Sequence, residues 1–297
     1  MDITQDIIDA IRPIHRRSPY KFHYFLRDLG LVYLAIPKNA NSFLRHALFA
    51  HSKMTADFRP AEESVAAYMN RTPSRRLKVR RRRALSNPHY CRLVVLRNPL
   101  ERLVSAYLEK FVRPGPDGMA DKYRGIVARA ARALDRNITP ETFTFEDFLR
   151  HAATCDDMEL NPHWRPQQHY VADTTFDFHG DVADLEATRA FLLGRLGIDI
   201  GATGGDRRTN ALRYAGGASD GMDAGRLTPT DLRAMEAYPA AASFYAPPLL
   251  ECFLQRYEPD LHLYATRLGY TREALLAPFR AGGPAMNPRG TIRNTGR

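Results

Sequence analysis

Two stretches of the chain share one pattern: a short apolar run, a polar turn, and then apolar positions at helical spacing. In the first stretch, residues 31–36 are apolar, β-branched or aromatic, and Pro37 ends the run, which predicts a buried strand. Apolar residues recur at helical spacing from Ser42 onward. We therefore predict a helix there, with Asn39, Asn41 or Ser42 as its N-cap residue.

The second stretch has the same pattern and a longer helix. Residues 90–96 (YCRLVVL) form another apolar run, and Pro99 suits the first position of a helix. The apolar residues that follow lie on one helical face: Leu100, Leu103, Val104, Tyr107, Leu108 and Phe111. The pattern predicts a second buried strand and a helix that ends near Arg113.

The rest of the chain alternates helices with one further short strand. We expect helices over residues 61–70, 119–136, 145–153, 183–196 and 231–238 and from residue 247 onward, and a strand over 174–178. Thr144 and Thr228 are suitable N-caps, and Gly197 is a suitable end for the fourth helix. Strands that alternate with helices predict an α/β fold with a mainly parallel sheet. We expect a single domain over residues 1–280.

Positive charge is concentrated in two segments. Residues 71–83 hold eight basic residues and residues 280–297 hold four, with no acid in either, so the remainder of the 43 basic and 33 acidic residues has a net charge of −2. This distribution favours a local anion site over a basic coat. The basic run within a mobile segment at 71–88 is a solvated loop, a surface for a polyanionic acceptor such as a uronic-acid polysaccharide, or a nucleic-acid site. Without interleaved aromatic residues or a known module, we expect no nucleic-acid partner.

Two further segments have the composition of irregular structure. Residues 201–226 hold seven glycines, which is typical of a mobile lid or a disordered insert, and residues 281–297 are expected to be a disordered tail. The three cysteines are far apart and have no metal or redox spacing, which indicates a reducing compartment. With neither an apolar run of about 20 residues nor a signal-peptide pattern at the start, we expect a soluble, cytoplasmic protein.

The turn after the first strand is a candidate anion site. A turn that leaves a buried strand and enters a helix presents free backbone N–H groups and the positive end of the helix dipole. Lys38 adds a full charge, and Asn41 and Ser42 add donors, although the turn is not a Walker A loop. Phosphate binding and an ordinary loop with a surface lysine both stay open on this pattern alone.

An arginine follows the second strand at the equivalent place. Arg97 ends that strand, and Ser105 lies eight residues later in the predicted helix. An arginine fork and a hydroxyl in this arrangement would converge on one anionic group. The alternative is that Arg97 pairs with Glu101 and that Ser105 only packs.

The two motifs together resemble those of the nucleotide-dependent sulfotransferases. The motifs are IPKNANSF (36–43) and VVLRNPLERLVSAYLEKF (94–111), and the resemblance is nearest to the Golgi carbohydrate sulfotransferases, sulfotransferase family 2. NPHWRPQ (161–167) resembles that family's N-x-H-W-R-P-Q segment, and residues 176–180 resemble its Y-D-F-x-G segment. Ala40 and Asn41 stand where the family usually has Gly, Ser, Thr or Cys. The family's disulfide cysteines and membrane anchor are absent, as expected of a bacterial, cytoplasmic relative.

The resemblance implies a three-layer, P-loop NTPase-like core with a mainly parallel sheet flanked by helices. It also implies that the donor is 3′-phosphoadenosine 5′-phosphosulfate (PAPS), which leaves as 3′,5′-adenosine bisphosphate, and that no metal is required. The residues expected to hold the donor are Pro37, Lys38, Asn39, Ala40, Asn41, Ser42 and Phe43 at the 5′ end, and Arg97 and Ser105 at the 3′-phosphate.

The reaction that the resemblance implies is sulfuryl transfer to an acceptor hydroxyl. Lys38 is expected to stabilise the leaving phosphate. His163 is our first choice as the base, since histidines ordinarily titrate near pH 6.5. Glu62 or Glu63 is the alternative base, and His89 is the third candidate.

The acceptor is expected to be a carbohydrate or another small hydroxylated molecule, possibly an acidic glycan, with Arg165 and Trp164 in contact with it. Two other function classes are a P-loop-like nucleotide or small-molecule kinase and a non-catalytic polyanion-binding protein. The missing Walker motif and the lack of a Mg²⁺ ligand after a strand argue against the kinase. The sequence indicates neither the identity of the acceptor nor the oligomeric state.

Overall fold

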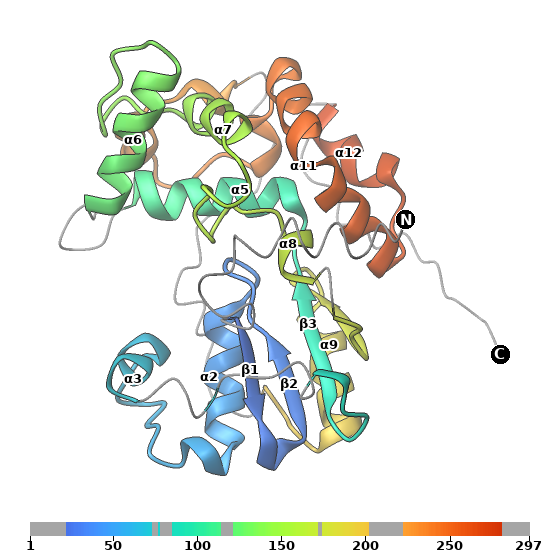
Figure 1. Cartoon of the computed structure of the whole chain (residues 1–297). Helices are drawn as coiled ribbons and strands as arrows, with labels where there is room; N and C mark the ends of the chain where they lie inside the picture. Colours follow the sequence, from blue (N-terminus) through green and yellow to red (C-terminus); the bar gives the residue numbers. More distant parts are fainter. Residues whose placement is uncertain are drawn as a thin grey trace, which may run out of the picture. The chain divides into compact units, whose positions relative to one another are not determined.

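The computed structural model describes residues 22–72, 77, 85–113, 121–171, 174–201 and 222–280 (Figure 1). The chain divides into two compact units, each taken over its described residues. Unit 1 comprises Met1–Arg97 and Asp156–Thr209, and unit 2 comprises Asn98–Cys155 and Asn210–Arg297. The single domain expected over residues 1–280 stays a prediction.

Unit 1 is built on a four-stranded sheet, counted over its described residues, with the strand order β1-β2-β3-β4. The strands are β1 (His23–Leu26), β2 (Leu31–Leu34), β3 (Cys91–Leu96) and β4 (Phe178–Asp181). β1 runs antiparallel to β2, whereas β2, β3 and β4 are parallel to one another. The predicted α/β fold with a mainly parallel sheet is therefore confirmed.

The two central strands are the two apolar runs of the sequence, and the outer strands differ from expectation. β4 begins at Phe178, four residues after the start of the strand predicted over 174–178. The shift arises because Asp177 lies beside Arg92, where its N–H donates to the Arg92 carbonyl and its carboxylate accepts from the Arg92 N–H (2.7 Å) and guanidinium. β1 was not predicted, since it is only four residues long.

Helices α2 (Asn41–His51), α3 (Val65–Arg71) and α9 (Leu185–Leu196) contribute to one hydrophobic core with the sheet (Figure 1). Alternate residues of β2 and β3 point into this core, as the period of a strand requires. Its members include Leu31, Tyr33, Leu93 and Val95 from the sheet, Leu44, Leu48 and Phe49 from α2, Val65 and Tyr68 from α3, and Leu192 from α9. Short elements at Arg27–Leu29, Lys53–Thr55 and α8 (Gln168–Val171) complete the described part of unit 1.

Strand β4 and helix α9 approach each other most closely at Gly180. A Cβ atom at this position would lie 2.3 Å from Oγ1 of Thr188 and 3.0 Å from Cγ2 of Val95. Thr188 and Val95 are almost fully buried, so neither can move aside freely. Glycine is therefore required here by packing.

Unit 2 is helical over its described residues. Its α-helices, over the same residues, are α5 (Pro99–Tyr107), α6 (Asp121–Ala133), α7 (Phe145–Thr154), α10 (Pro229–Ala234), α11 (Pro247–Leu268) and α12 (Arg272–Arg280). Short 3₁₀ turns lie at Ala224–Arg226 and Ala241–Phe244. The core contains a cluster of aromatic rings, with Phe111 4.9 Å from Phe143 and Tyr107 5.6 Å from Phe145 between ring centroids.

The predicted caps of unit 2 are present, and one predicted helix changes its winding. Thr144 and Thr228 both form capping boxes with the aspartate three residues later. The helix predicted from Pro99 to near Arg113 is α-helical as far as Tyr107 and continues as a π-helical turn, Leu108–Val112. Residues 73–76 and 78–84 of the basic segment, 202–221 of the Gly-rich segment and the tail 281–297 lie outside the described residues.

Candidate active site

The turn between β2 and α2 has an unusual backbone. Lys38 (φ 72°) and Ala40 (φ 51°) both adopt the left-handed conformation, which is uncommon and costly for residues other than glycine. Ala40 is the N-cap of α2 and no side chain caps the helix, so the prediction of Asn39, Asn41 or Ser42 as the cap is wrong. The first intrahelical hydrogen bond runs from Leu44 N–H to the Ala40 carbonyl (3.0 Å).

The start of α2 therefore presents backbone donors. The N–H groups of the first helical residues, 41–43, have no carbonyl partner within a helix. Ala40, the N-cap residue, offers them no side-chain acceptor. Together with the Lys38 ammonium group, these donors make the turn a suitable site for a phosphate or sulfate group.

Asn39 is fully buried and fastens the turn to its surroundings. Its Nδ2 atom donates to the carbonyl oxygen of Val95 on β3 (2.9 Å) and to Oε1 of Gln167 (2.5 Å). Its backbone N–H donates to the Ile36 carbonyl (3.3 Å). The side chain thus binds the neighbouring strand and loop instead of capping α2.

Arg97 lies directly after β3 and contacts the same turn. Its Nη1 atom donates to the Lys38 carbonyl oxygen at 3.3 Å. Gln167 holds the Arg97 backbone, because its Oε1 accepts from the Arg97 N–H (3.1 Å) and its Nε2 donates to the Arg97 carbonyl (2.8 Å). The lysine turn and the arginine are therefore neighbours within unit 1.

Ser105, the other residue predicted at the 3′-phosphate, belongs to unit 2. It lies in the second turn of α5, and its side chain is 5 % exposed. Its predicted convergence with Arg97 stays a prediction.

The segment 161–167 forms a loop that positions His163. The Asn161 Oδ1 atom accepts both the backbone N–H of His163 (3.1 Å) and its ring Nδ1 (2.7 Å). Because Oδ1 is an acceptor in both contacts, the ring donates through a protonated Nδ1. In the neutral ring, Nε2 is then the unprotonated nitrogen, the one that can accept a proton.

Trp164 and Arg165 are both part of the internal structure of this loop. Trp164 is 3 % exposed. The Arg165 guanidinium donates to the carbonyls of Asp157 (2.8 Å), Met158 (3.1 Å) and Leu160 (2.8 Å). These contacts hold the loop in shape, and the predicted contact of both residues with an acceptor stays a prediction.

The alternative base Glu63 is held in an ion pair. Its carboxylate accepts from Arg71 Nε (3.0 Å) and Nη2 (2.5 Å) and from the Arg59 N–H (3.2 Å). The hydrogen bond from Arg71 lowers the pKa of Glu63, which makes its carboxylate a weaker proton acceptor. Glu62 is exposed to solvent.

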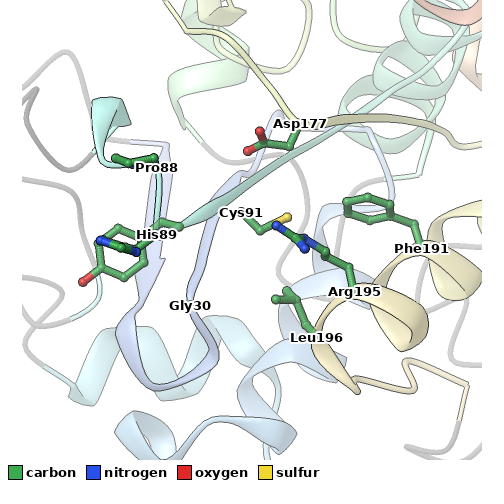
Figure 2. Close-up of a pocket in the computed structure, with 9 residues that line it drawn as sticks. Gly30, Pro88, His89, Cys91, Asp177, Phe191, Arg195 and Leu196 are labelled. Atoms are coloured by element: carbon green, nitrogen blue, oxygen red, sulfur yellow. The ribbon is translucent and has the colours of Figure 1, made fainter.

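The third candidate base, His89, lies near the amino end of β3, at the opposite end of the strands from Lys38 and Arg97. It lines a pocket with Gly30, Cys91, Asp177 and Arg195, among others (Figure 2). Gly30 and Cys91 stand at the amino ends of β2 and β3, whereas Lys38 and Arg97 follow their carboxyl ends. Ligands of open α/β sheets bind beyond the carboxyl ends of the strands, so this pocket is not the expected place for a nucleotide.

Two structural observations concern the described residues as a whole. Within those ranges, every helix is too short or too polar to cross a bilayer. No group of three histidine, cysteine or carboxylate side chains among them is arranged to hold a metal ion.

Sequence reasoning did not assign a role to Gln167. The residue was part of the matched segment 161–167, but its partners lie 128 and 70 residues away, at Asn39 and Arg97. The one signal in the sequence was that Gln167 belongs to the segment 161–167, which resembles the family's N-x-H-W-R-P-Q segment.

Comparison with known proteins agrees with the motifs. The profile of the sulfotransferase family matches residues 23–265. Carbohydrate sulfotransferase 14 of Danio rerio is 24% identical over 197 residues, which are 63% of this chain and 52% of the relative. Carbohydrate sulfotransferase 14 of Mus musculus and that of Homo sapiens are each 34% identical over 104 residues, 33% of this chain and 27% of the relative.

These matches cover about half or less of the curated relatives' length, and no solved structure matches significantly. The family profile, in contrast, extends over most of the chain and includes both units. The chain therefore belongs to the sulfotransferase family.

Proposed function

We propose that the protein transfers a sulfuryl group from PAPS to a hydroxyl group of a carbohydrate or another small hydroxylated acceptor. The observation that carries this proposal is the hydrogen bond of 3.3 Å between the Arg97 guanidinium and the Lys38 carbonyl. This contact joins the lysine turn before α2 to an arginine, beyond the carboxyl ends of the parallel strands β2 and β3. A nucleotide with phosphate groups at both its 5′ and 3′ positions needs cations and donors at two places close together.

The described residues fit such a donor. The N–H groups of residues 41–43 and Lys38 suit the 5′-phosphosulfate, since helix starts bind anions through their free amides. Arg97 suits the 3′-phosphate, with Ser105 as its proposed second ligand. The strand–turn–helix unit around Lys38 also supports a P-loop NTPase-like core of three layers as the proposed fold family.

The transfer breaks the bond between sulfur and the oxygen that bridges to the 5′-phosphate, and the electron pair stays on that oxygen. Lys38 and the backbone N–H groups stabilise this growing charge. One such donor is typically worth about 10²–10³-fold in rate. The acceptor oxygen forms the new bond to sulfur, and its proton passes to Nε2 of His163. Neither Glu62 nor the ion-paired Glu63 is needed as a base.

The acceptor class rests on the relatives and on charge. The similar proteins are named carbohydrate sulfotransferases, which makes a sugar hydroxyl the first choice. The basic run at residues 71–83 suits an acidic glycan. Arg165 and Trp164 are proposed to support the loop that faces the acceptor.

A binding titration tests the donor. We expect 3′,5′-adenosine bisphosphate to bind more tightly than ATP or duplex DNA, and Arg97→Ala to weaken that binding about 10- to 100-fold, because a charged hydrogen bond to the 3′-phosphate is lost. Equal binding of ATP would favour a kinase. Binding of DNA alone would favour a non-catalytic polyanion binder, and in either case the proposal fails.

A further inference from the structure

We propose that Gln167 is a positioning residue that locks the Lys38 turn and Arg97 into one rigid frame. The inference rests on the proposed function, because the frame is argued to hold the two phosphate-bearing ends of one nucleotide at a fixed separation. Gln167 is argued to act on the nucleotide indirectly, through Asn39 and through the backbone of Arg97.

The Gln167 carboxamide is fully engaged between the two parts of the site. Its Oε1 accepts from Asn39 Nδ2 (2.5 Å) and from the Arg97 N–H (3.1 Å), and its Nε2 donates to the Arg97 carbonyl (2.8 Å). The side chain is 0 % exposed. A buried amide with both ends bonded fixes the relative position of its partners, because each broken bond leaves a buried polar group unsatisfied.

The turn that Gln167 holds needs such a support. Lys38 and Ala40, on either side of Asn39, both have positive φ angles of 72° and 51°. A strained backbone of this kind persists only where the surroundings enforce it. The two hydrogen bonds donated by Asn39 Nδ2, to Val95 and to Gln167, enforce it from β3 and from the loop.

The same loop carries the proposed base. His163 lies four residues before Gln167. Just before His163, the Asn161 carbonyl accepts the N–H groups of Trp164 and Arg165 (both 3.0 Å). These hydrogen bonds fold residues 161–165 into a turn, and Gln167 follows two residues later. The hydrogen bonds of Gln167 then place the base and both donor-binding groups in one frame.

A frame of this kind has a consequence that simple packing does not. A ligand that binds both ends gains affinity from their fixed separation, whereas a ligand that binds one end does not. Loss of the Gln167 hydrogen bonds should therefore weaken 3′,5′-adenosine bisphosphate far more than 5′-AMP or 3′-AMP. A residue that only stabilises the fold would change all three affinities alike or none.

The test compares Gln167→Met, which keeps the length of the side chain, with Tyr170→Phe as a matched control. The Tyr170 hydroxyl donates to the Pro162 carbonyl (2.9 Å), so the control removes one hydrogen bond from the same loop without touching the turn. Calorimetric titration measures the bisphosphate and both monophosphates. We expect Gln167→Met to weaken the bisphosphate about 10-fold or more and each monophosphate less than about 3-fold, with no such difference in Tyr170→Phe.

Several outcomes would overturn the inference. Equal weakening of all three nucleotides, or unchanged bisphosphate affinity in Gln167→Met, contradicts the frame while leaving the proposed function intact. If the wild-type protein binds no bisphosphate, the proposed function fails and the inference with it. Should Gln167→Met not fold, Asn39→Ser removes the hydrogen bond to Gln167 from the other side, together with the one to Val95, and is expected to give the same difference between nucleotides.

Discussion

Replacement of His163 by alanine separates the candidate bases. The Asn161 carboxamide holds His163 with Nδ1 protonated, so that Nε2 is the nitrogen able to take a proton. A positioned base typically contributes about 10²–10⁴-fold to the rate, or about 2.7–5.4 kcal/mol of the barrier. We therefore expect His163→Ala to lower kcat by that factor and to leave bisphosphate affinity unchanged, because the ring is not part of the donor-binding group.

Removal of the Asn161 side chain, which holds the His163 ring, should lower kcat by a smaller factor. A neutral hydrogen bond is worth about 0.5–1.5 kcal/mol net, which corresponds to about 2- to 13-fold. Asn161→Ala should lower kcat by roughly that much, because the ring loses its orientation and its fixed proton position. Glu63→Gln should change kcat less than about 3-fold, since Arg71 already holds that carboxylate in an ion pair.

The assay is transfer of labelled sulfuryl from saturating PAPS to an acceptor, measured as kcat from pH 5 to 9. The wild-type rate should rise with pH through the range in which histidines titrate, and this rise should be lost in His163→Ala. Unchanged turnover in His163→Ala would refute the reasoning. A collapse of kcat in Glu63→Gln would transfer the role to the glutamate.

Two further predictions concern the stability of unit 1. Gly180→Ala should lower the free energy of unfolding by about 1–3 kcal/mol, because the new Cβ would lie 2.3 Å from Thr188 Oγ1; in urea titrations Thr188→Ala in the same chain should restore most of the loss, and no restoration would contradict the packing argument. Asp177→Asn should cost about 1 kcal/mol at pH 7, because Arg92 lowers the pKa of Asp177 and its side chain is 40% exposed. That contribution is complete above the unfolded pKa near 4 and is lost as the pH falls through the lower folded value, so the difference from wild type in thermal melts should shrink below pH 4; a constant difference would argue against the ion pair.

The central sheet followed from the sequence because its two middle strands are continuous apolar runs. β2 and β3 are buried on both faces, and such strands have a clear hydrophobic pattern. The edge strands β1 and β4 have only four residues each, and their limits are set by partners distant in sequence. The Arg92–Asp177 contact, which fixes where β4 begins, joins residues 85 positions apart and leaves no local pattern.

In the candidate site, too, features that follow from local sequence were predicted, and features set by distant partners were not. The resemblance implied that Lys38 and Arg97 hold the two ends of one nucleotide, and in the structure the Arg97 guanidinium donates to the Lys38 carbonyl. The N-cap of α2 was wrongly predicted, since Asn39 binds Val95 and Gln167 in preference to its own helix. Capping propensities describe hydrogen bonds between a side chain and nearby backbone, whereas the Asn39 side chain bonds to buried groups distant in sequence.

The most direct test of the account is the structure of the protein with 3′,5′-adenosine bisphosphate bound. We expect the 5′-phosphate at the N–H groups of residues 41–43 beside Lys38, and the 3′-phosphate at Arg97. A bisphosphate seated instead in the pocket of His89 and Arg195, at the amino ends of the strands, would contradict it.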